Sequence, residues 1–270
     1  MKFAFRADAS ATLGLGHLKR CLALAHALRE RGAGVRFFCR PGDIDSASLV
    51  EAEGFATTLL GAAAAQGEVA DATAFVHAAR ALRPDVVLVD HYGLGARWHR
   101  AVRGALAARL AAIDDLADRA HDVDVLIDHN LSADAAAKYA GRLNAGTKLL
   151  SGPRYALLGP AYAAAPRCNV AAEVQSIGIC MGGADALNLN ETALDACRTL
   201  ADFHGEIEVA TTSANPHLER LRERLLTDPR TRLCLDQTDL AAFFARHGLH
   251  IGAGGGATWE RCCIGAPRWP

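Results

Sequence analysis

Short apolar runs alternate with longer segments of helical spacing along most of the chain. Residues 2–5 are mostly apolar, and over 18–31 apolar residues recur three or four positions apart, which predicts a strand followed by a helix. Strands covered on both faces are continuously apolar, and four further runs have this character: 35–39, 86–89, 110–113 and 125–127. With helices expected near 72–82 and 97–106, this half of the chain predicts a parallel, doubly wound sheet.

Strands and helices alternate again after a stretch that contains three prolines amid alanine. We assign residues 1–151 to a first Rossmann-like domain, 152–173 to a linker and 174–270 to a second Rossmann-like domain. The strands expected in the second domain cover 176–180, 207–210, 233–235 and 250–251, and a helix is expected over 187–200. The fold class is therefore α/β.

Composition narrows the class of protein. The 270 residues are 51% hydrophobic and 22% charged, with a formal net charge of −1, which is typical of a globular chain with two domains. Basic residues are scattered, so the sequence does not favour binding to nucleic acid or to an anionic membrane. The start has no signal-peptide pattern, and the 8 cysteines are dispersed, so we expect buried thiols in a cytoplasmic protein that is a monomer and contacts no membrane.

A glycine loop and a histidine follow the first predicted strand. Gly14 and Gly16 allow a tight turn and close approach to a ligand, and the free N–H groups of the following helix favour an anion such as a diphosphate. At the positive end of the helix dipole the ring of His17 is favoured in its neutral form, which can act as a general base. A lone histidine here would more simply cap or pack against the loop, but the glycines and nearby Asp8 favour catalysis. Lys19 replaces the third glycine of a dinucleotide-binding fingerprint.

Polar residues also follow the later strands of the first domain. The carboxyl ends of parallel strands meet at one edge of a sheet, so these residues should converge with the His17 loop. We interpret Asp90 and Asp114 as helix caps and His91 as a surface residue. For Tyr92 and Asp115, the sequence favours a functional role and a structural role equally.

Two glycine-rich loops follow predicted strands in the second domain. The first covers 181–185, and the second covers 252–260 and opens a helix. Each alone is weak evidence, because a tight turn is reason enough for glycine. The 252–260 loop repeats the arrangement of the 14–17 loop, and two such loops on two sheets predict a ligand-binding cleft between the two domains.

Six segments, taken in order, resemble the UDP-sugar hydrolases of pseudaminic acid biosynthesis. They are FRADAS at 5–10, GLGH at 14–17, DHYG at 90–93, IDD at 113–115, ICMGG at 179–183, and residues 252–263. The resemblance implies a glycosyltransferase-B-like (GT-B-like) architecture and hydrolysis of UDP-2,4-diacetamido-2,4,6-trideoxy-β-L-altropyranose, in which water attacks the anomeric carbon with inversion. It also implies that neither a metal nor another cofactor is required, and a role in flagellin glycosylation.

The same resemblance implies roles for individual residues. His17 falls at the position of the catalytic histidine. The residues expected around the sugar are Asp8, Gly14, Gly16, Tyr92 and Asp115. Those expected to bind UDP are Gly182, Gly183, Asn215, Gly254, Gly255, Thr258 and Glu260.

Two alternatives to a hydrolase stay open. The family that the chain resembles continues past the second glycine loop into a further strand and closing helices, so we expect the second domain to be incomplete at its C-terminus. That expectation allows an inactive, truncated protein that binds a nucleotide sugar. The other alternative is a UDP-sugar glycosyltransferase of similar architecture, which requires an acceptor groove.

Overall fold

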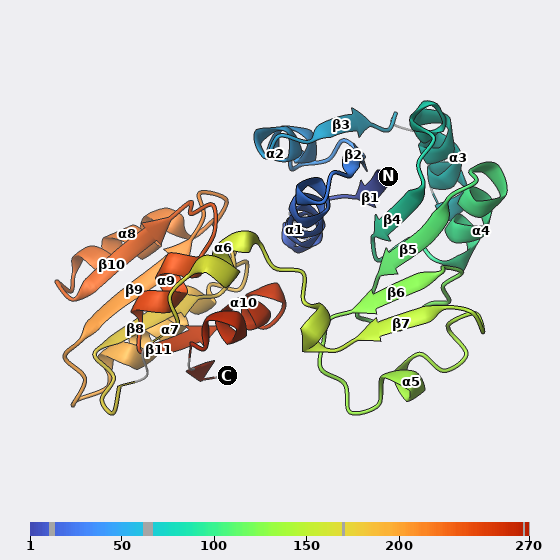
Figure 1. Ribbon diagram of the computed structural model, residues 1–270. Coiled ribbons are helices and arrows are strands. Elements are labelled where there is room, and N and C mark those ends of the chain that lie inside the picture. Colours follow the sequence, from blue (N-terminus) through green and yellow to red (C-terminus); the bar gives the residue numbers. More distant parts are fainter. Residues whose placement is uncertain (11–13, 62–66, 169–170, 267, 270) are drawn as a thin grey trace. The chain divides into compact units, whose positions relative to one another are not determined.

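The computed structural model describes residues 1–10, 14–61, 67–168, 171–266 and 268–269. The chain divides into two compact units, Met1–Leu157 and Leu158–Pro270 (Figure 1). Each unit is an α/β domain around a fully parallel sheet, so the predicted fold class, two Rossmann-like domains, is confirmed. The division lies within the segment 152–173 expected as a linker, of which 169–170 fall outside the described residues.

The first unit contains a seven-stranded sheet in the order β3-β2-β1-β4-β5-β6-β7. Its strands are β1 (Lys2–Ala7), β2 (Gly34–Cys39), β3 (Ala56–Leu59), β4 (Val86–Asp90), β5 (Arg109–Ile113), β6 (Val125–Asp128) and β7 (Lys148–Ser151). Its helices are α1 (Gly16–Glu30), α2 (Ser46–Ala52), α3 (Glu68–Ala79), η1 (Arg80–Leu82), α4 (Ala96–Ala105), α5 (Ala135–Lys138) and η2 (Pro153–Tyr155). The predicted helix 18–31 begins earlier, so that His17 lies in its first turn.

Side chains of the central strands alternate between two apolar cores. On β1, Ala4 packs into the core that α3 and α4 cover, whereas Phe5 packs into the core beneath α1 and α2. Figure 1 shows these two pairs of helices on opposite faces of the sheet. Burial on both faces explains the continuously apolar strand sequences.

The second unit contains a five-stranded parallel sheet in the order β10-β9-β8-β11-β12. Its strands are β8 (Ser176–Cys180), β9 (Glu206–Thr211), β10 (Thr231–Leu235), β11 (Leu249–Gly252) and β12 (Arg268–Trp269). Its helices are α6 (Pro160–Ala164), α7 (Leu189–Arg198), α8 (Leu218–Leu226), α9 (Ala241–Arg246) and α10 (Gly256–Ile264). Helix α6 arises within the expected linker, and its Tyr162 is buried with residues of α9 and α10.

Each sheet has a point at which the order of its strands reverses. Strand β1 lies between β2 and β4, and β8 lies between β9 and β11. Open α/β sheets bind ligands at the carboxyl ends of the strands beside such a point. The loops that leave β1, β4, β8 and β11 are therefore the places to look for a site.

Two expectations drawn from composition can be compared with the structure. Among the described residues, no helix is long and apolar enough to cross a membrane. Five cysteines are buried and two are half-buried, but Cys262 is exposed. The expectation of uniformly buried thiols is therefore wrong for Cys262.

We predict that buried His99 makes the first unit less stable in acid. Its ring is 0% exposed, and burial, followed by the charges of His121 and Arg119, lowers its pKa to about 3. Between that value and about pH 6.5 the unfolded chain binds a proton that the folded chain does not. Moving from pH 7 to 5 should therefore cost about 2 kcal/mol of unfolding free energy through this side chain.

Urea unfolding at both pH values, compared with His99→Gln, measures this contribution. Glutamine keeps an acceptor for the Asp122 amide, which donates to His99 Nδ1 over 3.2 Å, and it does not titrate. The variant should lose less stability on acidification than the parent chain. Equal losses would contradict the prediction.

Candidate active site

A buried carboxylate at the end of β4 holds His17. Asp90 is 1% exposed, and its Oδ1 lies 2.6 Å from His17 Nδ1. Burial raises the pKa of Asp90, but hydrogen bonds from Arg20 and His17 outweigh that effect and lower it. An ionised carboxylate only accepts hydrogen bonds, so Nδ1 carries a proton, and in the neutral ring the lone pair is on Nε2. Among the described residues, no group hydrogen-bonds Nε2, which is free to take a proton.

Arg20 lies one helical turn after His17 and binds the same carboxylate. Its Nε and Nη2 donate to the two oxygens of Asp90 over 2.5 Å each, and its Nη1 lies 3.3 Å from Asp115 Oδ2. Burial lowers the pKa of Arg20, but hydrogen bonding and charge from Asp90 more than reverse this. Nη2 is also 3.1 Å from His17 Nδ1. Both atoms are donors in this tautomer, so that contact is not a hydrogen bond.

Tyr92 packs against the ring of His17. The ring centroids are 4.4 Å apart and the planes meet at 78°. Burial and the neighbouring carboxylate of Asp115 raise the pKa of Tyr92 to about 12, so the phenol stays protonated at neutral pH. The structure thus brings together three of the predicted residues: His17, Tyr92 and Asp115.

Asp8 belongs to a second ionic cluster at the same sheet edge. Arg6 donates to both of its oxygens, over 2.5 and 2.8 Å, and the Arg40 amide donates to Oδ1 over 2.8 Å. His91 Nε2 lies 3.6 Å from Asp8 Oδ2. His91 is half-buried, and burial and the charge of Arg6 lower its pKa, so its interpretation as a surface residue is wrong.

The predicted glycine loop leads directly into α1. Gly14 has a φ of +71°, which favours glycine, and its amide donates to the Ser10 carbonyl over 2.7 Å. A Cβ on Gly16 would meet nothing within 4 Å. Residues 11–13 fall outside the described residues, and within those that are described no side chain caps α1 at Leu15. The start of α1 therefore has no side-chain cap among the described residues.

The two glycine loops of the second unit differ in how their helices begin. Asp185 accepts from the amides of Leu189 and Asn190 over 2.8 and 2.9 Å, so a carboxylate already caps α7. Helix α10 follows Gly255, whose φ is +83°, and no side chain in the described parts of the chain caps it. A Cβ on Gly254 would meet nothing within 4 Å. The start of α10 therefore suits an anion better than the start of α7.

The other residues expected to bind UDP make contacts of their own. The Asn215 amide donates to Thr211 Oγ1 over 3.0 Å and accepts from the His217 amide over 2.8 Å, which holds the turn after β9. Gly182 has a φ of +92°, and the Gly183 carbonyl accepts from the Thr211 hydroxyl over 3.1 Å. Their contacts with UDP stay predictions.

Thr258 and Glu260 lie on the first turns of α10. The Thr258 amide donates to the Gly255 carbonyl over 3.0 Å. The pKa of Tyr162 is raised mainly by burial and, to a smaller extent, by the negative charge of Glu260. Their binding of UDP likewise stays a prediction.

The partners of His17 were not predicted from the sequence. Asp90 was interpreted as a helix cap, but its oxygens bind His17 and Arg20, and α4 begins after Gly95 instead. The cap interpretation is wrong because a buried carboxylate satisfies ring and guanidinium donors first. One signal was available: Arg20 stands three residues after His17, on the same face of a predicted helix.

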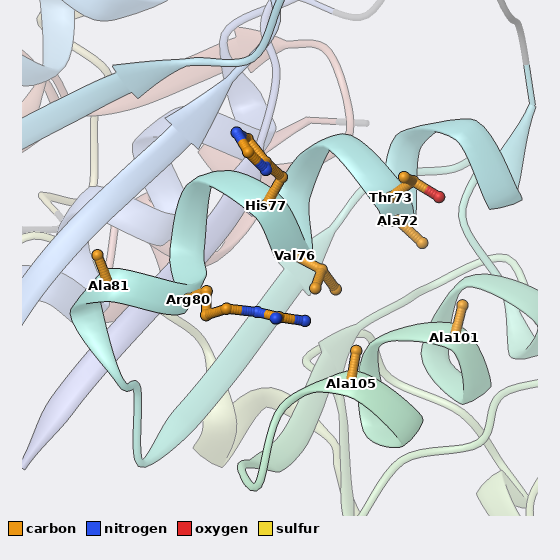
Figure 2. Close-up of a pocket in the computed structure, with 8 residues that line it drawn as sticks. All are labelled: Ala72, Thr73, Val76, His77, Arg80, Ala81, Ala101 and Ala105. Carbon is orange, nitrogen blue, oxygen red and sulfur yellow. The ribbon is translucent and has the colours of Figure 1, made fainter.

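A groove between α3 and α4 lies away from this site. It measures about 760 Å³, and Figure 2 shows Val76, Ala101 and Ala105 facing one another across it, while His77 points away. Its lining is mostly small and apolar and lacks converging polar groups, so it does not have the character of a reaction site. In the described parts of the chain, no three His, Cys, Asp or Glu side chains are grouped to hold a metal ion.

Solved structures define the class of fold as GT-B-like. MurG of Acinetobacter baumannii aligns with a TM-score of 0.59 at 15% identity, over 96% of this chain and 73% of that one. UDP-GlcNAc 2-epimerase of Neisseria meningitidis, bound to UDP-GlcNAc, aligns with a TM-score of 0.60 at 11% identity, over 99% and 81%. No family model matches.

Two proteins of known sequence are similar over most of the chain. The UDP-2,4-diacetamido-2,4,6-trideoxy-β-L-altropyranose hydrolase of Campylobacter jejuni is 26% identical over 242 residues, which are 89% of this chain and 80% of that protein. The spore coat polysaccharide biosynthesis protein SpsG of Bacillus subtilis is 22% identical over 263 residues, or 97% and 74%.

We predict that Arg20→Leu destabilises the first unit by about 3–5 kcal/mol, because it leaves the carboxylate of Asp90 buried without its main partner. Urea unfolding measures the loss, with exposed Lys19→Leu as the control on the same helix. Adding Asp90→Asn to Arg20→Leu removes the charge and should recover part of the stability. A double variant no more stable than Arg20→Leu would contradict this account.

Proposed function

We propose that this protein hydrolyses a UDP-linked 2,4-diacetamido-2,4,6-trideoxy sugar to UDP and the free sugar. The observation that carries the proposal is the pair of His17 and Asp90, in which a buried carboxylate holds the ring with Nε2 ready to accept a proton. The similarity to the Campylobacter jejuni hydrolase across 89% of the chain supports this substrate class. The coarser statement, an enzyme that acts on a nucleotide sugar, also agrees with the epimerase structure that contains UDP-GlcNAc.

In the proposed reaction His17 is the general base. Nε2 takes a proton from water as the water oxygen bonds to the anomeric carbon, and the bond from that carbon to the diphosphate oxygen breaks with inversion. Its electron pair leaves with UDP. Asp90 stabilises the imidazolium through Nδ1 and holds the ring in the required tautomer. Tyr92, whose phenol hydrogen-bonds Asp115, is proposed to pack against the sugar beside His17.

The diphosphate is assigned to the start of α10. A helix N-terminus, with glycine allowing close approach, stabilises the negative charge that develops on the leaving group. Gly254, Gly255, Thr258 and Glu260 lie on this loop and the first turns of the helix, and Gly182 and Gly183 follow β8 beside it in the sheet. Diphosphate is a good leaving group, so this charge stabilisation supplies much of the catalysis.

We expect the parent chain to release UDP and the free sugar from the UDP-linked diacetamido-trideoxy-altrose, and His17→Ala to release neither at a measurable rate. Asp90→Asn should retain UDP binding but lose about 10²–10⁴ in kcat, because the ring loses the partner that fixes its tautomer. Proton NMR of both products measures turnover and the configuration of the sugar first released.

The matched control is His77→Ala, which removes an exposed histidine of the same unit and should leave the rate unchanged. Turnover that survives His17→Ala would overturn the assignment of the base. UDP binding without turnover in the parent chain would favour a binding protein instead. Turnover only after a sugar acceptor is added would favour a transferase.

We predict that Gly256→Ala weakens UDP binding by about tenfold or more without loss of stability. The new methyl group meets no protein atom within 4 Å, and alanine favours a helix over glycine by about 1 kcal/mol. Any loss of affinity would then come from a steric clash between the new methyl group and bound UDP. Calorimetric UDP titration and thermal unfolding measure the two effects, with Gly104→Ala in α4 as the control. Unchanged affinity would remove α10 from the proposed diphosphate site.

A further inference from the structure

A second pocket of the first unit lies beside Tyr92 and is rich in arginine. It measures about 260 Å³ and is lined by residues from the β4–α4 loop, the first turns of α4 and the loop after β5. Three of them are arginines: Arg97, Arg100 and Arg119. At roughly 30 Å³ for each water, the space holds about eight waters, enough for a phosphate or carboxylate group and the atoms next to it.

The charges in this pocket are unbalanced. Arg97 and Arg100 stand three residues apart on the exposed side of α4, where like charges repel. Among the described residues, no carboxylate pairs with either of them. Arg119 is fixed, because its Nη2 pairs with Asp114 over 2.9 Å and its Nη1 with Asp118 over 2.8 Å. The surplus positive charge therefore rests on Arg97 and Arg100.

The carboxylate of Glu68, which lines the pocket, already accepts hydrogen bonds from the backbone. Glu68 Oε2 accepts from the amides of Gly95 and Trp98 over 2.9 and 3.1 Å, so it caps α4 from the neighbouring helix. This cap fixes the first turn of α4, which carries Arg97. The two arginines are thus presented from a firmly held helix, next to the tyrosine that packs on His17.

We propose that this pocket is a subsite for the acidic group of a second ligand, a phosphate or a carboxylate held by the forks of Arg97 and Arg100 beside the reaction site. Planar guanidinium groups bind such anions through two parallel hydrogen bonds. The proposal goes beyond hydrolysis of a UDP-sugar, since water carries no charge and the diphosphate is assigned to α10. The proposal does not depend on which molecule accepts the sugar.

The test is a titration of the ¹⁵N-labelled full chain with sodium phosphate, and separately with sodium glucuronate, at constant ionic strength so that screening does not change. Saturating UDP is present, so that the proposed diphosphate site is filled. Amide shifts at Gly93 and Ala96 report on the pocket. The variant is Arg97→Gln/Arg100→Gln, and the control is Arg109→Gln, an exposed arginine at the opposite end of β5.

We expect saturable shifts in the parent chain and the control, and affinity at least about tenfold weaker in the double variant. The anion that binds more tightly identifies the acidic group, phosphate or carboxylate. Equal affinity in all three proteins, or no saturation by either anion, would overturn the proposal. Binding seen only without UDP would also overturn it, because the pocket would then hold the diphosphate of UDP. None of these outcomes depends on turnover.

Discussion

The carboxylate of Asp90, buried at the end of a central strand, is the constraint on which the site depends. A charge in that position must be compensated, and both compensating groups, His17 and Arg20, come from α1. Their bonds tie α1 to β4 across the point where the strand order reverses. The same bonds fix the tautomer of His17. One set of contacts thus compensates the buried charge and orients the ring of His17.

The helices that begin beside the points where the strand order reverses differ in whether a carboxylate binds their first amides. Carboxylates fill the starts of α4 and α7, through Glu68 and Asp185. The starts of α1 and α10 have no acidic residue in the first turn, and within the described residues no side chain caps them. A helix start already neutralised by a carboxylate has little attraction left for a ligand anion. Within the described residues, each unit therefore has one of these starts bound by a carboxylate and one without a side-chain cap.

The sequence predicted the central strands and the loops that follow them, because burial on both faces and glycine leave strong local signals. It missed β3 and β7, which are short edge strands whose partly exposed residues lack a continuous apolar run, and β12, which has only two residues. In the site, the places of His17 and Tyr92 after strands predicted that they lie together at one sheet edge, and their rings are in contact. It misread Asp90, since the same residue after a strand serves as a cap or as an ion-pair partner, and only the neighbouring helix decides which.

A base held in this way does not by itself determine the reaction. Nε2 of His17 would remove a proton from water or from a sugar hydroxyl by the same step, and solved structures with this fold include a glycosyltransferase and an epimerase. Whether hydrolysis or transfer occurs depends on whether water or an acceptor hydroxyl lies next to Nε2. Water needs no binding groups, whereas an acceptor must be held, and unpaired Arg97 and Arg100 beside Tyr92 are groups that could hold an acidic one. The first unit thus carries the proposed base and, in the pocket beside Tyr92, the arginines proposed to hold an acidic ligand.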